Sequence, residues 1–260
     1  MACNTAAVRR TVLALLGLVF VIIGCGRDPM GVEVDAAGER QRVDCAGTAG
    51  PAVVLVHGLG ERASSASFNA VMTRLADDRR RCRFDRPGAG DSPAPSRAGR
   101  DAADLDRELA AVVDRADPDA PVVLVGHSFG SYPVLHFAAR HPDRVRAVVT
   151  LDGVEPGFGV LRALGAADLG QVAMAGEGLD LAAVQRQTAA AAGRPAALGD
   201  LPLVVLERHA APADWRAAQR RLAALSSAGR LITVAGSGHE IPTDAPDRVI
   251  EAIRAVSGGD

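Results

Sequence analysis

Short runs of apolar, often β-branched residues alternate along this 260-residue chain with longer stretches whose apolar residues recur at helical spacing. Such short runs are typical of strands buried on both faces, and the longer stretches are typical of amphipathic helices. The predicted strands lie at 53–57, 121–125, 145–151, 202–206 and 231–234. The predicted helices lie near 67–79, 101–115, 130–140, 213–225 and 245–256. This alternation predicts an α/β protein with a mostly parallel, doubly wound sheet and helices on both faces.

Two segments depart from this alternation. Residues 31–45 predict an early β-hairpin that adds an antiparallel edge, and a further strand begins at Cys82. Residues 155–200, rich in Ala, Gly and Leu, interrupt the rhythm between two strands. We expect short helices in this insertion, with an irregular surface loop as the alternative.

The pentapeptide Gly126-His127-Ser128-Phe129-Gly130 lies between the strand at 121–125 and the helix at 130–140. A G-x-S-x-G sequence in this position is what a nucleophile elbow requires, because the sharp turn exposes the serine hydroxyl. The flanking glycines leave room for such a turn. We therefore take Ser128 as the candidate nucleophile, with an ordinary strand-to-helix turn as the structural alternative.

Three further motifs surround this pentapeptide in a fixed order. They are His57-Gly58 after the first buried strand, the loop Asp85-Arg86-Pro87-Gly88-Ala89-Gly90-Asp91-Ser92, and the late Ser237-Gly238-His239. With these motifs the chain resembles the α/β-hydrolase superfamily over roughly residues 50–255. The resemblance implies the α/β-hydrolase fold, with a small helical lid inserted at about 155–200 where substrate choice would reside.

The remaining chemistry of a serine nucleophile needs a base and an oxyanion hole. The base accepts the proton of Ser128, and His239 is the best candidate because it follows the last strand on a glycine-flanked loop. His209 is the rival. For the oxyanion hole we expect two backbone N–H groups, those of Phe129 and Leu59.

The acid that orients the base has three candidates. The superfamily usually places it after the strand that ends here at Leu206, where the chain offers Glu207 and Asp214 but no Gly-x-x-Asp turn. Asp152 directly follows the preceding strand, a position that some branches of the superfamily use instead. We favour Asp152, because burying an aspartate at the end of a strand costs free energy, and such a residue is expected only where it has a functional role. Asp214, Glu207 and the absence of any acid remain alternatives.

Composition and charge exclude several other classes of function. The net charge is −2, and the 29 basic residues, all arginine, are scattered among acidic residues. We therefore expect no positively charged surface that would bind nucleic acid. Aromatic residues make up only 3%, which argues against a base-stacking surface. No Lys-Ser/Thr follows the glycines of the 85–92 loop, so we expect no phosphate cradle but a structural turn with Arg86 in a salt bridge. We expect no cofactor and no metal ion.

The N-terminus predicts export. Two arginines precede an uncharged, largely apolar stretch at 11–24, which is short of the roughly 20 residues that a transmembrane helix needs. A signal peptide at 1–24 fits better. Its end, Ile22-Ile23-Gly24-Cys25, resembles a bacterial lipobox, which implies that Cys25 is lipidated and anchors a hydrolase domain at 26–260 to the extracytoplasmic side of the cell membrane. An uncleaved anchor and an ordinary signal peptide are the alternatives.

Export also bears on the cysteines. Cys45 and Cys82 are the two thiols left in the mature domain, and an oxidising compartment favours their pairing. In this superfamily the early hairpin and the strand at Cys82 lie in the same region of the sheet. The bridge would close a loop of about 37 residues and add about 3 to 4 kcal/mol of stability. Two buried free thiols are the alternative.

Two functions remain for the chain as a whole. The favoured one is a serine hydrolase that cleaves an ester, amide or thioester bond of a small or lipidic substrate through an acyl-enzyme intermediate. The alternative is a lipid-anchored binding or sensing protein that keeps the hydrolase pocket without turnover. The sequence contains no signal for an oligomeric state.

Overall fold

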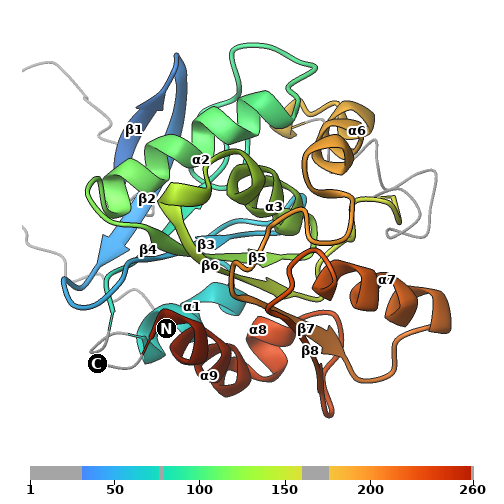
Figure 1. Ribbon diagram of the computed structural model, residues 1–260. Helices are drawn as coiled ribbons and strands as arrows, with labels where there is room; N and C mark the ends of the chain where they lie inside the picture. The colour runs from blue at the N-terminus through green and yellow to red at the C-terminus, as the bar shows by residue number, and fades with distance from the viewer. Residues whose placement is uncertain (1–30, 76–78, 160–175, 259–260) are drawn as a thin grey trace, which may run out of the picture.

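The computed structural model describes residues 31–75, 79–159 and 176–258, and the strands form one eight-stranded sheet in the order β1-β2-β4-β3-β5-β6-β7-β8 (Figure 1). The strands are β1 (Val32–Ala36), β2 (Glu39–Ala46), β3 (Val53–Val56), β4 (Arg81–Asp85), β5 (Val122–His127), β6 (Val145–Leu151), β7 (Leu203–Arg208) and β8 (Gly229–Val234). Strands β3 to β8 are parallel, whereas β2 pairs antiparallel with both β1 and β4. The sheet is therefore mostly parallel with an antiparallel edge, as predicted.

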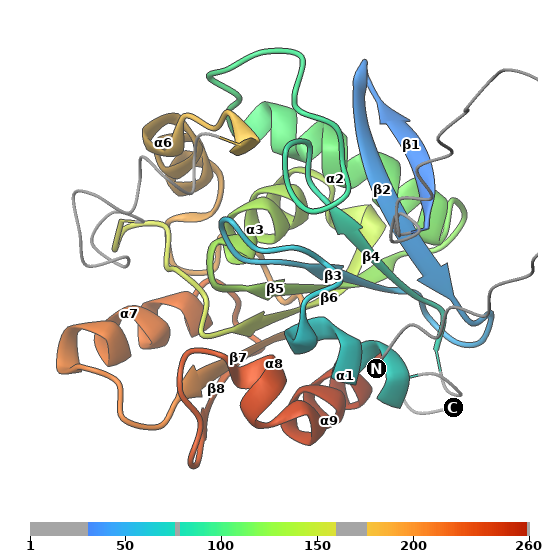
Figure 2. The same cartoon turned by 180° about the vertical axis from the view of Figure 1, so that it is seen from behind.

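Helices cover both faces of this sheet. Figures 1 and 2 show α1, α8 and α9 on one face and α2, α3 and α7 on the other, with α6 against α2 and α3. The helices are α1 (Ala66–Arg74), α2 (Ala102–Ala116), α3 (Ser131–Arg140), α6 (Leu181–Ala192), α7 (Ala213–Ala223), α8 (Ile241–Asp244) and α9 (Pro246–Ser257), with single 3₁₀ turns at Ser128–Gly130 and Pro142–Arg144. This is the doubly wound α/β architecture that the alternating pattern predicted.

The central strands are apolar throughout because both of their faces are buried. Along β5, Leu124 packs into the core beneath α2 and α3, while Val123 and Val125 pack into the core beneath α1 and α9. Every residue of β5 is buried. Parallel strands end at the same edge of a sheet, so polar residues that follow β3, β5, β6, β7 and β8 are brought to one place.

The antiparallel edge carries a disulfide bond. Cys45 on β2 lies directly opposite Cys82 on β4 in the strand register, with their Cα atoms 4.1 Å apart. The side chains form the predicted Cys45–Cys82 disulfide. The bond thus ties the early hairpin to the parallel part of the sheet.

The insertion at 155–200 contains a helix, as expected. The structure describes residues 155–159 and 176–200 of this segment, and α6 packs against α2 and α3. The rest of the insertion lies outside the described residues.

No helix in the described part of the chain is long and apolar enough to cross a membrane. The signal peptide predicted at 1–24 and the lipidation site predicted at Cys25 lie outside the described residues.

Candidate active site

The elbow pentapeptide forms a sharp turn between β5 and α3. Ser128 has a φ of 51°, a left-handed conformation that costs a non-glycine residue roughly 1–3 kcal/mol. A Cβ atom on Gly130 would lie 2.2 Å from the carbonyl oxygen of Val56, and one on Gly126 would lie 2.6 Å from that of Gly130. Both positions therefore require glycine. The Ser131 hydroxyl holds the turn by donating to the Ser128 carbonyl at 2.8 Å.

Three side chains from the ends of three strands form a hydrogen-bonded chain. The Ser128 hydroxyl donates to Nε2 of His239 at 3.0 Å, and Nδ1–H of His239 donates to Oδ2 of Asp152 at 2.6 Å. Ser128 and Asp152 are buried, whereas the His239 side chain is 37% exposed. The structure thus brings together the residues predicted as nucleophile, base and acid, in the order that proton transfer from serine requires.

The buried carboxylate of Asp152 has partners on both oxygens. Oδ1 accepts hydrogen bonds from the Trp215 indole N–H at 2.7 Å and from the Arg208 backbone N–H at 3.3 Å. The Arg208 guanidinium lies 3.1 Å from Oδ2 and stacks over the Trp215 ring at 4.8 Å. These contacts compensate the cost of burying a charge and fix the carboxylate toward His239.

The competing candidates lie elsewhere. Asp214 is exposed at the start of α7, where its carboxylate accepts the N–H of Trp215 at 2.9 Å. Glu207 is buried on β7 and accepts a hydrogen bond from the Thr233 hydroxyl at 2.7 Å. His209, the rival base, is exposed.

The two predicted oxyanion donors lie at the ends of neighbouring strands, β5 and β3. Phe129 directly follows Ser128 in the chain, and Leu59 lies on the loop after β3, the strand that pairs with β5. Within the described residues, neither backbone N–H donates to a carbonyl or a side chain. Free donors beside a nucleophile are what an oxyanion hole needs.

Arg86 fixes the oxyanion loop, which is the loop after β3 that carries Leu59. Its guanidinium donates to the carbonyl oxygens of His57 and Gly58, each at 2.7 Å, and forms a buried ion pair with Glu177 at 2.7 Å. Glu177 also accepts the N–H of Gly60 at 3.0 Å. The salt bridge predicted for Arg86 is confirmed, and its partner comes from the insertion.

His57 is neutral in this environment. Its Nδ1–H donates to the Gly58 carbonyl at 2.8 Å, and its Nε2 accepts the backbone N–H of Arg86 at 3.3 Å. Complete burial, together with the charge of Arg86, lowers the pKa of His57 to about 3. His57 thus connects the loop after β3 to the loop after β4.

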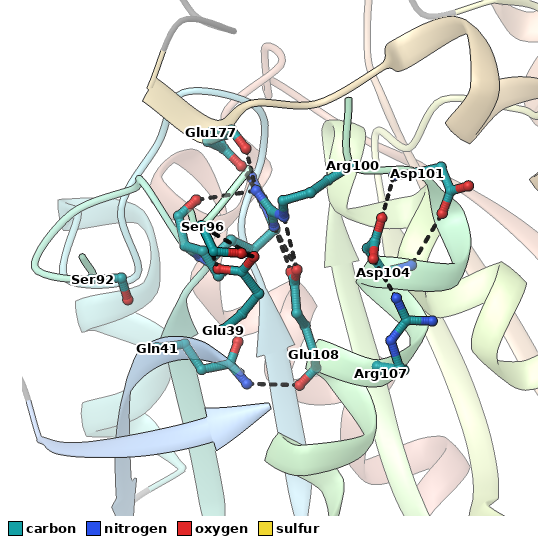
Figure 3. A network of polar contacts seen from close by, with 12 residues as sticks. Glu39, Gln41, Ser92, Ser96, Arg100, Asp101, Asp104, Arg107, Glu108 and Glu177 are labelled. Carbon is teal, nitrogen blue, oxygen red and sulfur yellow. Dashed lines mark hydrogen bonds and ion pairs between the residues drawn. The ribbon is translucent and has the colours of Figure 1, made fainter. Parts of the chain in front are cut away.

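A second buried arginine, Arg100, joins the insertion to α2 (Figure 3). Arg100 makes a bidentate ion pair with Glu108, both oxygens at 2.7 Å, and its guanidinium donates to the carbonyl of Glu177. The backbone N–H of Arg100 donates to the Gly178 carbonyl oxygen at 2.9 Å, and the Arg100 carbonyl oxygen accepts the N–H of Asp180 at 2.8 Å. Burial raises the pKa of Glu108 to about 7, although the positive charge of Arg100 acts to lower it. This network fixes the chain at Glu177, and with it the partner of Arg86.

An apolar cluster adjoins the nucleophile. It joins the elbow, the insertion and α7, and comprises Leu105, Phe129, Tyr132, Val154, Leu179, Leu181, Val184, Ala211 and Trp215, with Leu59 and Phe158 packed against it. Among the described residues, the nine members of this cluster are buried, and only Leu59 and Phe158 at its margin are partly exposed.

Several residues of the site escaped the sequence analysis. Trp215 is the single tryptophan of the chain, which was a usable signal, but nothing in the sequence marked Arg208 or Glu177. Among the described residues, His127, His239 and Glu240 lie close enough to hold a metal ion. Both ring nitrogens of His239 are already bound to Ser128 and Asp152, so a metal would compete with that chain.

Comparison with known proteins gives a consistent family. A family model described as alpha/beta hydrolase fold matches residues 51–230. A pimeloyl-acyl-carrier protein methyl ester esterase of Neisseria meningitidis is 38% identical over 96 residues, 37% of this chain and 34% of the relative. A 2-hydroxymuconate semialdehyde hydrolase of Pseudomonas sp. is 33% identical over 144 residues, 53% of this chain and 48% of the relative. The chain thus spans about a third to a half of the length of these curated relatives.

Solved structures agree on the fold. The structure of Est1E from Butyrivibrio proteoclasticus with bound ferulic acid superposes with a TM-score of 0.65 at 20% identity, over 86% of this chain and 97% of Est1E. At this identity the similarity establishes the arrangement of the elements.

Proposed function

Because the chain belongs to the α/β-hydrolase family and is an enzyme of that family, we propose that it is a serine hydrolase that cleaves an ester bond, or an amide or thioester bond, of a small or lipidic substrate. The observation that carries the proposal is the hydrogen-bonded chain from Ser128 through His239 to Asp152. The relatives named as esterase and hydrolase support the same reaction type.

The geometry supports an acyl-enzyme mechanism. As the Ser128 oxygen attacks the substrate carbonyl carbon, Nε2 of His239 takes the hydroxyl proton, and Asp152 stabilises the resulting imidazolium. The carbonyl oxygen becomes an oxyanion that the N–H groups of Phe129 and Leu59 receive. His239 then returns the proton to the leaving group, and a water molecule, activated by the same histidine, releases the acyl group from Ser128.

The surroundings of Ser128 favour a substrate with an apolar group. The side chains of Phe129 and Trp215 belong to the apolar cluster, and Leu179 and Leu181 bring the insertion into it. We therefore expect the insertion at 155–200 to act as the lid that selects the substrate.

We also propose that the enzyme is exported and anchored by a lipid on Cys25. The apolar stretch at 11–24 with its lipobox-like end supports this, and the Cys45–Cys82 disulfide fits an oxidising compartment. The variant Cys25→Ser should release the protein from membranes. Continued membrane partitioning, with labelled palmitate incorporated at another residue, would contradict the anchor.

The reaction is tested by substitution of the nucleophile. Ser128→Ala should reduce hydrolysis of a short p-nitrophenyl ester by about 10⁴-fold or more while the fold is retained. Ser227→Ala, at an exposed serine after α7, is the matched control and should behave as the wild type. A fluorophosphonate probe should label the wild type and not Ser128→Ala. An unlabelled wild-type protein would favour the binding or sensing role instead.

A further inference from the structure

His127, the second residue of the elbow pentapeptide, lies beside the chain of Ser128, His239 and Asp152 without belonging to it. Its side chain is completely buried. Nε2 is 3.0 Å from the backbone carbonyl oxygen of His239, and Nδ1 is 3.2 Å from a carboxylate oxygen of Glu61. Both ring nitrogens therefore face acceptors.

The two acceptors fix the protonation of His127. A carbonyl oxygen can only accept, so Nε2 must carry a hydrogen. An ionised Glu61 can also only accept, so Nδ1 must carry one as well, which makes the ring an imidazolium paired with a carboxylate. The directions in which the pKa values of His127 and Glu61 are shifted agree with this charged pair. Burial alone would lower the pKa of His127, but the hydrogen bond and charge of Glu61 raise it overall. Burial alone would raise the pKa of Glu61, but the bond and charge of His127 lower it overall.

The pair connects the loops on which the proposed reaction depends. Glu61 accepts the backbone N–H of Gly58 at 3.3 Å, directly before the proposed donor Leu59. His127 ends β5, immediately before Ser128, and holds the backbone of His239. We infer that His127 and Glu61 form a charged positioning pair that fixes the loops of His239 and Leu59 relative to Ser128. The inference rests on the proposed serine hydrolase function.

The groups around the pair set its pH range. The His239 ring lies 5.0 Å from that of His127 between centroids, and the charge of Glu240 helps to raise the pKa of His127. His57 helps to lower the pKa of Glu61 only once it is itself protonated, near pH 3. Because the pKa of His127 is raised above its ordinary value, the pair persists to a higher pH than an ordinary histidine would allow and is lost as the pH rises through that raised pKa. Because the pKa of Glu61 is lowered, the pair is lost in acid only below the ordinary carboxyl range.

Two variants separate the geometry of the pair from its charge. His127→Phe removes both donors and should lower kcat for a p-nitrophenyl ester by about 10- to 100-fold with little change in KM, because the loops lose their alignment. Glu61→Gln keeps the geometry with a neutral His127: the new amide donates to Nδ1 while Nε2–H still donates to the His239 carbonyl. Its kcat should fall only a few-fold, and the alkaline limb of its kcat/KM profile should disappear.

A matched control removes a buried histidine outside the site. His136 lies on α3, is 6% exposed and belongs neither to the hydrogen-bonded chain of Ser128, His239 and Asp152 nor to the oxyanion loop. His136→Phe should retain the wild-type kcat and pH profile.

The outcomes distinguish this inference from the proposed function. A wild-type protein that does not react with a fluorophosphonate overturns the proposed function. A reactive wild type with an equally active His127→Phe, or with an unchanged alkaline limb in Glu61→Gln, overturns the positioning pair alone. If circular dichroism shows that His127→Phe does not fold, the pH profile of Glu61→Gln decides by itself.

Discussion

At the carboxyl ends of the parallel strands the ion pair of Arg86 and Glu177 is buried, whereas at the outer antiparallel edge the ion pair of Arg40 and Glu33 lies largely in solvent. Arg86 and Glu177 are 1% and 2% exposed, while the side chains of Arg40 and Glu33, which pair across β1 and β2, are 60% and 35% exposed. The edge is strengthened by a disulfide instead.

The contrast shows two different uses of polar groups. Buried ion pairs contribute little net stability against an apolar replacement, so their presence around Ser128 points to positioning. Of the four non-glycine residues with left-handed backbone in the described part of the chain, Ser128 and Asp152 lie at this end of the sheet, while Ala37 and Ala196 lie in turns, Ala37 in the edge hairpin. Strain at residues that also carry the proposed chemistry persists only where the surroundings enforce it. Substitutions at the carboxyl ends should therefore change activity, and those at the edge should change stability alone.

Among the charged groups at the carboxyl ends, the largest effect is expected at the acid. Asp152→Asn should reduce kcat by about 10³- to 10⁴-fold, because the amide can hold His239 in the wrong tautomer and does not balance the imidazolium charge. Steady-state kinetics with a p-nitrophenyl ester measure the loss. Asp214→Asn is the matched control and should cost little. The reverse ranking would transfer the role to Asp214, and circular dichroism must show that Asp152→Asn is folded.

A buried charge left without its partner should be the next most costly change. Glu177→Leu leaves the Arg86 guanidinium unpaired beside the oxyanion loop and should lower the free energy of unfolding by about 3–5 kcal/mol. The double variant with Arg86→Met should be less destabilised than the sum of its two single variants, as urea titrations can determine. Strict additivity would show that the ion pair does not couple these residues.

The edge should respond in stability and not in turnover. Replacing Cys45 and Cys82 together by alanine should lower the free energy of unfolding by about 3 to 4 kcal/mol, since the denatured chain loses the constraint of the closed loop. At a temperature well below the melting transition, kcat should stay at the wild-type value. A large loss of kcat in the folded double variant would mean that the edge also positions the site.

Protonation of the buried His57 should lower the free energy of unfolding in acid. The unfolded histidine takes up its proton near its ordinary pKa of 6.5, while the folded one resists protonation down to about 3, so stability falls as the pH decreases between these values. From pH 7 to pH 5 this one residue should account for about 2 kcal/mol of lost stability. His57→Gln does not titrate, so its free energy of unfolding should vary less over this range. An equal slope in both proteins would show that His57 does not govern the acid response.

The smallest effect is expected at the exposed ion pair of the edge. Arg40→Ala should change the free energy of unfolding by less than about 1 kcal/mol, because solvent screens the pair with Glu33. Thermal denaturation of the variant beside the wild type measures this. A larger loss would show that ion pairs at the antiparallel edge and at the carboxyl ends of the strands differ less in strength than the exposure of their side chains indicates.

The local elements of this chain could be predicted from its sequence, because they depend on residues that are neighbours in the chain. Apolar runs such as 121–125 mark buried strands, and the predicted strands and helices recur in the structure with shifts of a few residues at their ends. The short helix α8 was missed because four residues carry too little periodicity. The glycines at 126 and 130 marked the elbow, since close backbone contacts exclude any side chain there.

The partners of the site residues were decided by the tertiary structure. Asp152, Asp214 and Glu207 were all compatible with the sequence, and only the order of β6 and β7 in the sheet, with Trp215 and Arg208 packed behind, places the Asp152 carboxylate against His239. The pairing of two buried charges depends in the same way on how distant segments pack. Arg86 and Glu177, 91 residues apart in the chain, meet only because the insertion returns to the oxyanion loop. Sequence patterns record the preferences of neighbouring residues, whereas the charge and orientation of a buried side chain depend on groups that only the folded chain brings within a few ångströms.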